Sequence, residues 1–230
     1  MNTPTDTVPP LCPPPEPNPH PPSRFQVPVG AVDTHAHVVG ESFVPERSYT
    51  PPPAPPRDYL AMLDATGMTY GVLVQVSVHG TDNSLLLQTL SAHPDRLRGI
   101  AVAPHDLSDA ALAELKDAGV VGLRLNTISG GGIGLDRLAD YERLCAELGW
   151  HLQLLTHADR LAPVASRLSR LRVPYVIDHM GGFDVDAGPR APGWKLMLRL
   201  VADGAWVKVS GAYRLSKTPP YADTIPFARS

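Results

Sequence analysis

Short apolar runs alternate with helical patterns along most of this chain. The apolar runs are four to six residues long and lie at 29–32, 70–74, 97–102, 120–125, 151–155, 173–177 and 205–209. Between them, apolar residues recur at helical spacing over 58–65, 84–92, 109–118, 135–148, 161–171 and 194–202. Parallel strands are covered on both faces and are therefore apolar throughout. The pattern predicts a series of parallel β/α units.

Four of the predicted helices end at a glycine just before the next apolar run. These glycines are Gly67, Gly119, Gly149 and Gly204. Glycine adopts the left-handed conformation that commonly follows the last helical residue, because it has no Cβ atom to clash there. Each glycine therefore marks the end of one helix and the approach to the next strand.

Seven strands are compatible with a doubly wound sheet and with a (β/α)8 barrel. Polar residues follow nearly all seven apolar runs, and a barrel brings all these strand ends to one face. An open sheet would gather its ligand groups at a single switch point. After Val209 the chain shows a helix-like start at 221–229 but no eighth apolar run. We therefore predict an α/β fold, a TIM-like (β/α)8 barrel that is truncated after strand seven.

Proline is concentrated at the start of the chain. Of the 26 prolines, 11 lie in residues 1–28, where large apolar side chains are few. Such a segment buries too little apolar surface to offset its chain entropy. We expect residues 1–28 to be a disordered proline-rich tail and 29–230 to be the barrel, which lacks its last β/α unit. A second cluster at 51–56 predicts a stiff surface loop.

Charge and composition exclude several classes of protein. The net charge is −3, which argues against a nucleic-acid partner. Two cysteines are too few for a disulfide scaffold, and no apolar stretch reaches the roughly 18 residues of a membrane span. No secretory signal pattern opens the chain. We expect a cytoplasmic protein with a small-molecule substrate and no membrane or nucleic-acid partner, while the oligomeric state stays open.

Four histidines follow predicted strands. His35 and His37 come after strand one, His157 after strand five and His179 after strand six. His35 and His37 are two residues apart, so in an extended chain they face the same side, and paired imidazoles suit a divalent metal. One buried histidine is usually a packed core residue, but four at equivalent strand ends predict a site. Asp178 directly precedes His179 and would point to the opposite face if the strand continues.

Other polar residues sit within or just after the strands. Arg124 lies inside an apolar strand, where a charge is costly unless it meets an anion. Its guanidinium could hold a substrate carboxylate through two hydrogen bonds, or it could form an ion pair inside the barrel. Ser77 and His79 alternate with apolar neighbours after strand two and could reach a ligand. The glycine-rich segment 129–134 lacks the lysine of a phosphate-binding loop and predicts a mobile loop.

Five motifs occur in order along the chain. They are Val32–His37, His79–Asn83, Gly122–Arg124, Asp178–Gly181 and Lys208–Ser210. In this order they resemble the amidohydrolase superfamily, and within it the branch of 2-pyrone-4,6-dicarboxylate hydrolase-like lactonases. The resemblance covers about residues 29 to 230. It implies a barrel enzyme that opens a lactone or a related cyclic ester.

The resemblance also assigns roles to particular residues. It implies that His35, His37 and His179 are catalytic. The residues implied to bind substrate are Tyr49, Ser77, His79, Arg124, Asn126 and Arg214. The family's general base is an aspartate after strand eight, which none of these 230 residues matches.

Two cofactor states are compatible with the sequence, namely no cofactor or one divalent metal ion, with Zn²⁺ as the expected ion. His35, His37 and His157 would then be the metal ligands. Three protein ligands and a water form a competent catalytic zinc site, in which the pKa of the water falls to roughly 7.

These observations lead to one principal hypothesis and two alternatives. The principal hypothesis is a hydrolase that opens a small carboxylate-bearing lactone, 2-pyrone-4,6-dicarboxylate or a related compound, from the breakdown of aromatic compounds or sugar acids. Water would attack the ring ester carbonyl, and the oxyanion would be stabilised by histidines or a metal. The first alternative is a metal-dependent decarboxylase of the same superfamily. The second is a truncated barrel that is catalytically incomplete.

Overall fold

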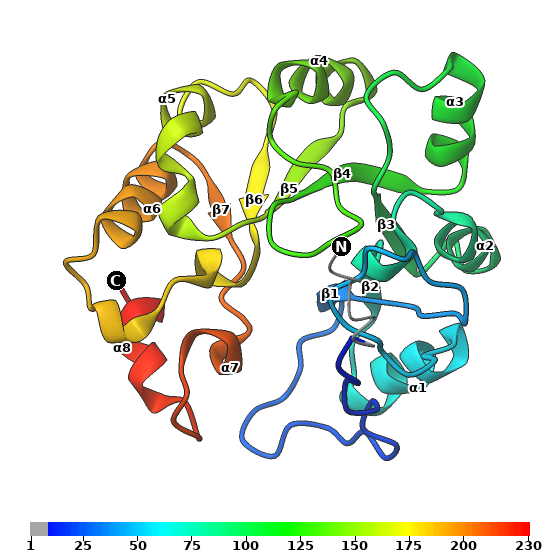
Figure 1. Ribbon diagram of the computed structural model, residues 1–230. Coiled ribbons are helices and arrows are strands. Elements are labelled where there is room, and N and C mark those ends of the chain that lie inside the picture. The colour runs from blue at the N-terminus through cyan, green and yellow to red at the C-terminus, as the bar shows by residue number, and fades with distance from the viewer. Residues whose placement is uncertain (1–8) are drawn as a thin grey trace, which may run out of the picture. The chain divides into compact units, whose positions relative to one another are not determined.

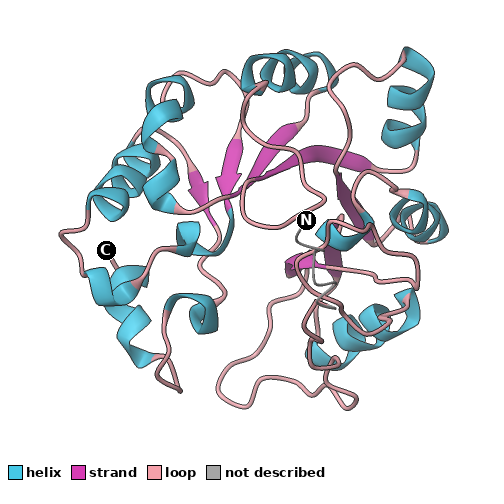
Figure 2. Cartoon of the chain, viewed as in Figure 1, coloured by secondary structure: helices cyan, strands magenta, loops and turns pink. Residues whose placement is uncertain are grey.

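The computed structural model describes residues 9–230 (Figure 1). Strands and helices alternate along the described chain (Figure 2). The strands are β1 (Val32–Ala36), β2 (Tyr70–Val74), β3 (Leu97–Ala101), β4 (Val120–Asn126), β5 (His151–Leu155), β6 (Tyr175–Ile177) and β7 (Trp206–Val207). The α-helices are α1 (Pro56–Thr66), α2 (Ser84–Ala92), α3 (Asp109–Asp117), α4 (Leu138–Leu148), α5 (Ala165–Leu168), α6 (Pro192–Ala202), α7 (Ala212–Leu215) and α8 (Ile225–Ala228). The 3-10 helices are η1 (Ser77–His79), η2 (Ala158–Arg160), η3 (Ala162–Val164), η4 (Asp178–Gly182), η5 (Val185–Ala187) and η6 (Ala222–Thr224).

The chain divides into two compact units. The first contains the described chain up to Val102 together with 108–120 and 129–131. The second contains 103–107, 121–128 and 132–230. In the first unit β2 pairs in parallel with β1 and with β3, and the β1–β2 register shifts between Asp33 and Ala36. In the second unit β4, β5, β6 and β7 pair in parallel one after another.

The strand order follows the chain from β1 to β7. This order, with helices between parallel strands, confirms the predicted β/α architecture. Each unit has its own set of fully buried leucine and isoleucine side chains, which the apolar strands and helix faces supply. In the first unit these are Leu63, Leu73, Leu86, Leu90, Leu97 and Ile100, and in the second they are Leu123, Leu125, Leu152, Leu154, Leu161 and Leu168.

Helix ends agree with the glycine signals. Gly67, Gly119, Gly149 and Gly204 all have positive φ, at 81°, 101°, 68° and 107°.

Within the described residues, no helix combines the length and the apolar character that crossing a membrane requires.

Three element boundaries differ from the predictions. Strand β1 begins at Val32, three residues after the apolar run starts, because the preceding residues form a turn in which Gly30 has φ 83°. The helix predicted over 161–171 is reduced to η3 and α5. Strand β7 is only two residues long.

The proline-rich segment has specific backbone contacts. Leu11 forms a parallel bridge with Thr50, the Cys12 N–H donates to the Thr50 carbonyl at 3.0 Å, and the Thr50 N–H donates to the Pro10 carbonyl at 2.9 Å. Pro10, Leu11 and Cys12 thus have backbone partners in the chain after β1, and the disorder of 1–28 stays a prediction. Residues 1–8 of the predicted tail lie outside the described residues.

The glycine-rich segment is closely packed, which differs from the mobile loop that we expected. The Gly130 N–H donates to Ser48 Oγ at 3.0 Å, and a Cβ atom on Gly130 would overlap the Glu46 carbonyl oxygen. A Cβ atom on Gly131, whose φ is 79°, would lie 2.5 Å from the Ser77 carbonyl oxygen. The absence of side chains lets this backbone approach two other backbone segments.

We therefore predict that Gly130→Ala destabilises the protein by about 1–3 kcal/mol, because the new methyl group would force two backbone segments apart. The measurement is the free energy of unfolding in urea. The matched control is Gly134→Ala in the same loop, where the nearest atom to the new Cβ would be Asp136 Oδ2 at 3.4 Å, an ordinary contact. Equal stabilities of the two variants would contradict the packing argument.

Candidate active site

The first pair of candidate residues lies at the end of β1. The His35 and His37 rings are 5.0 Å apart between centroids, with an angle of 85° between their planes. His37 Nδ1 lies 2.7 Å from the Val74 carbonyl oxygen. A carbonyl oxygen can only accept, so Nδ1 is the donor and a neutral His37 ring has its lone pair on Nε2. Through Nε2, His37 can accept a proton or bind a metal.

A buried tyrosine supports this end of β1. The Tyr59 hydroxyl on α1 donates to Asp33 Oδ2 at 3.0 Å, and Asp33 Oδ1 accepts from the His35 N–H at 3.3 Å. Burial, and next the negative charge of Asp33, raise the pKa of Tyr59, so its hydroxyl stays a donor. A Cβ atom on Gly71 would overlap the Tyr59 hydroxyl, so the glycine leaves it room. The sequence motif indicated His35 and His37, but it did not indicate the hydrogen bond between Tyr59 and Asp33 that supports them.

His79 is a packed, neutral side chain. The residues Ser77–His79 form η1, so they do not alternate along an extended strand as we expected. The Gly40 N–H donates to His79 Nε2 at 3.2 Å, and the ring stacks on Phe43 with 6.2 Å between centroids. Burial lowers the pKa of His79, and the nearby Asp82 carboxylate opposes this. Ser77 is likewise buried.

In the second unit, Asp178 is the centre of a buried charged network. Its Oδ2 accepts from Arg124 Nη2 at 3.2 Å and from Gln153 Nε2 at 2.9 Å. Lys208 Nζ lies 3.4 Å from Asp178 Oδ1 and donates to Gln153 Oε1 at 2.9 Å. Asp178 is fully buried and Arg124 is 4% exposed. The internal ion pair that we left open for Arg124 is therefore present.

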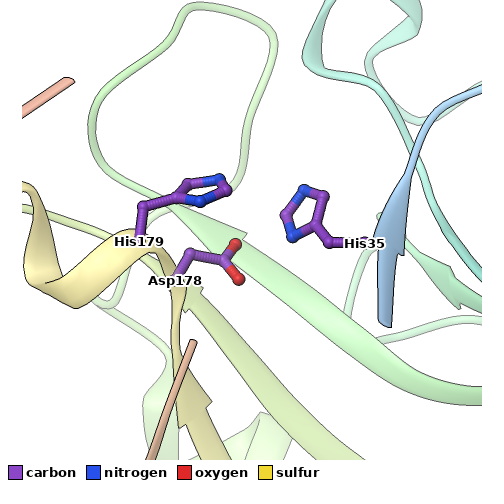
Figure 3. Close-up of side chains that lie close together, drawn as sticks. All are labelled: His35, Asp178 and His179. Atoms are coloured by element: carbon purple, nitrogen blue, oxygen red, sulfur yellow. The ribbon is translucent and has the colours of Figure 1, made fainter. Parts of the chain in front are cut away.

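His179 follows Asp178 in a strained turn. His179 and Met180 have φ values of 50° and 52°, a left-handed conformation that costs energy for residues other than glycine. Strand β6 ends at Ile177, so the continuing strand that would direct Asp178 and His179 to opposite faces is not present. His179 Nδ1 lies 2.9 Å from Ser210 Oγ, and its ring and the Asp178 carboxylate lie within 4.8 Å of each other at their ligand atoms (Figure 3).

The remaining predicted residues have varied surroundings. His157 Nδ1 lies 2.9 Å from the Gly182 carbonyl oxygen, so a neutral ring presents its lone pair on Nε2 as in His37. Asn126 is buried, and its side-chain oxygen accepts from the Ile128 N–H at 2.9 Å. Arg214 is exposed and donates to the Tyr213 hydroxyl at 3.3 Å. Tyr49 packs, partly buried, against the cluster of Val39, Val76 and Val78.

Figure 3 also draws His35, on β1. In the second unit, Asp178 and His179 offer a carboxylate and an imidazole, donor types that divalent metals bind. The rings of His37 and His157 are each oriented by a carbonyl oxygen at Nδ1, an arrangement that is typical of metal-bound imidazoles.

The chain belongs to the amidohydrolase family. The family model described as Amidohydrolase matches residues 32–230, nearly the whole parallel β/α region and all the strand-end histidines.

Several relatives are named as lactone hydrolases. The chain is 35% identical over 223 residues to a 2-pyrone-4,6-dicarboxylate hydrolase from Comamonas testosteroni, an alignment that covers 90% of this chain and 73% of the relative. It is also 35% identical over 219 residues to a 4-sulfomuconolactone hydrolase from Rhizobium radiobacter, which covers 91% and 73%.

A solved structure agrees with the fold. A probable 2-pyrone-4,6-dicarboxylic acid hydrolase from Acinetobacter baumannii, crystallised with citric acid bound, is 34% identical with a TM-score of 0.77, and the match covers 87% of this chain and 76% of that one. These comparisons confirm the predicted family, the TIM-like fold with seven strands in this chain, and the class of hydrolytic enzyme.

We predict that Asp178→Asn destabilises the second unit by about 3–5 kcal/mol, because Arg124 and Lys208 lose the carboxylate that compensates their buried charges. Adding Lys208→Met to Asp178→Asn should recover part of this loss by removing one cation. Urea unfolding of wild type, single variant and double variant measures both effects. A double variant no more stable than Asp178→Asn would show that charge compensation is not the cause.

We also predict a pH effect from His79. Its pKa is lowered in the folded state from an ordinary value of about 6.5, so below pH 6.5 the unfolded state binds more protons and stability falls. Between pH 7.5 and 5.5 the wild type should lose more unfolding free energy than His79→Gln, which retains an acceptor for the Gly40 N–H. Urea titrations at both pH values measure the difference, and equal losses would contradict it.

Proposed function

We propose that this protein opens a small carboxylate-bearing lactone by adding water to the ring ester carbonyl. Relatives at about 35% identity are named as hydrolases of 2-pyrone-4,6-dicarboxylate and of 4-sulfomuconolactone, both anionic compounds. The substrate class of this chain follows from that likeness and from the charged network in its second unit.

The observation that carries the proposal is the sharing of one buried carboxylate by two cations. Arg124 and Lys208 both lie within 3.4 Å of Asp178 oxygens, so these three side chains together have a charge of +1. Guanidinium and ammonium groups are also the donors that bind a carboxylate, so this pair of cations supports an anionic substrate. Arg214, which is exposed, is proposed as a further contact for an anionic substrate group.

We assign the reacting groups to His35, His37 and His179. These residues lie at the carboxyl ends of β1 and β6 in a sheet of parallel strands, the end where enzymes of this fold carry their active sites. His179 is positioned by Ser210, and when Ser210 donates to Nδ1, the Nε2–H of His179 can donate to the carbonyl oxygen as it becomes an oxyanion. His37 Nε2 is proposed to take a proton from the attacking water.

The reaction balances without another reactant. Water forms a bond to the carbonyl carbon, the ring C–O bond breaks, and the ring oxygen leaves with the proton taken from water. The product is a hydroxy acid, or, where the ring oxygen was attached to a C=C carbon, an enol acid that tautomerises to the keto acid. Tyr49, Ser77, His79 and Asn126 are proposed to shape the binding surface around this reaction.

A divalent metal held by His35, His37 and His157 is proposed from the sequence pattern alone. A carbonyl oxygen orients Nδ1 of His37 and of His157, so a neutral ring of each has its lone pair on Nε2. Such an ion would supply Lewis-acid activation of the attacking water. The residues' own roles in orienting the substrate and accepting protons are the same in either case.

The proposed setting is the cytoplasm. Cys12 and Cys145 are both free thiols, and burial raises the pKa of Cys145 to about 12, which keeps it unreactive. A net charge of −3 argues against a nucleic-acid partner, so the proposed partner is the small-molecule substrate alone.

The test is a panel of lactones with and without carboxylate or sulfonate groups. We expect kcat/KM to fall by at least about 100-fold in His179→Ala, which loses an oxyanion donor. Arg124→Met should raise KM for carboxylated lactones more than for uncharged ones. His93→Ala, at the C-terminal end of α2, is the control and should be unchanged. Unchanged rates in both active-site variants, or release of carbon dioxide in place of ring opening, would overturn the proposal.

A further inference from the structure

A cavity of about 570 Å³ lies in the first unit beside His37. Three segments surround it together with the end of β1: the N-terminal residues 14–19, the proline-rich loop before α1, and the first turns of α1. The lining residues are Pro14, Pro15, Glu16, Pro17, Pro19, Ala36, His37, Pro53, Ala54, Pro55, Asp58, Tyr59, Ala61 and Met62. Its volume is in the range of pockets that bind small molecules.

One wall of this cavity comes from the proline-rich segment. We call residues 9–19 the N-terminal strap. The strap is joined to the chain after β1 by the Leu11–Thr50 bridge and by hydrogen bonds of Thr50 with Pro10 and Cys12. The Thr50 hydroxyl also donates to the Pro9 carbonyl at 3.5 Å. These contacts place Pro14, which follows the bridge by three residues, at the edge of the cavity.

The lining is poor in hydrogen-bond donors. Proline has no backbone N–H, and six of the lining residues are prolines. The Tyr59 hydroxyl donates to Asp33, and His37 Nδ1 is directed to the Val74 carbonyl. The lining surface is therefore mainly hydrocarbon from proline rings, alanines and Met62.

The charges of the lining are of one sign. Glu16 and Asp58 are acidic, and no lysine or arginine is among the lining residues. A carboxylate in this cavity would be repelled and would lose its hydration without gaining a cationic partner. An uncharged apolar group would gain free energy from burial against the same surface.

From this lining we infer that the cavity is a substrate subsite for an uncharged apolar group, and that the N-terminal strap forms its outer wall. The inference rests on the proposed function, since it places an apolar substituent of the lactone beside His37. The substrate would then carry an alkyl or aryl substituent in addition to its carboxylate. Because proline restricts φ, this wall loses little conformational entropy when the cavity is filled.

Binding is tested with N-phenyl-1-naphthylamine, a neutral apolar dye whose fluorescence rises on burial. The strap variant is Pro14→Ser/Pro15→Ser/Pro17→Ser, and the matched control is Pro21→Ser/Pro22→Ser, two prolines outside the lining. We expect the dye to bind wild type and control alike, and at least about tenfold more weakly to the strap variant. Met62→Lys should weaken binding similarly by placing a charge in the cavity. Circular dichroism checks that each variant is folded.

Substrate preference connects the cavity to catalysis. The ratio of kcat/KM for an aryl-substituted lactone to that for its methyl analogue should fall about tenfold in the strap variant and stay constant in the control. The subsite would be overturned if the strap variant and Met62→Lys both bound the dye as tightly as wild type. It would also be overturned if both kept the wild-type ratio of kcat/KM values. If the dye binds as expected but wild type hydrolyses no lactone, the proposed function fails, and the subsite can no longer be assigned to a lactone. If wild type hydrolyses lactones but does not bind the dye, the subsite alone is overturned.

Discussion

The buried carboxylate of Asp178 is the interaction on which the second unit depends. Its partners come from three parts of the chain: Arg124 from β4, Gln153 from β5 and Lys208 from the chain just after β7. A carboxylate that is fully removed from water is tolerated only when such partners compensate it. One side chain thus connects β4, β5, the end of β6 and the chain after β7. Because the next residue is His179, the same network fixes the backbone from which the candidate catalytic imidazole extends.

The sequence was most informative where chemistry follows a strand directly. His35 and His179 are predicted site residues, because the polar residues that follow apolar parallel strands gather at one end of such a sheet. The geometry of His179 could not be predicted, because its left-handed φ is held by contacts distant in sequence. The Met180 N–H donates to the Lys208 carbonyl at 3.0 Å, and Ser210 bonds the ring. Local propensity contains neither contact.

Composition was a weaker guide to the proline-rich and glycine-rich segments. Prolines indicate that a segment cannot build a core, but they do not exclude backbone bonds at its other residues, such as Cys12 with Thr50. Glycines at 130 and 131 indicate freedom when the segment is considered alone. In the structure they are needed because the backbone of Glu46 and Ser77 approaches too closely for any side chain. In both segments the deciding partner is far away in the chain.

The two units are proposed to bind different kinds of substrate group, and the free energy that the apolar preference requires is small. A tenfold preference requires about 1.4 kcal/mol. At roughly 25 cal/mol per Å², this corresponds to about 55 Å² of apolar surface, considerably less than an aromatic ring buries. The cavity beside His37 is large enough for such a ring. A substrate carboxylate needs cations such as Arg124 and Lys208, because its charge must be compensated. An apolar substituent needs only a surface from which water is excluded, and a proline-rich strap with few hydrogen-bond donors is sufficient for that.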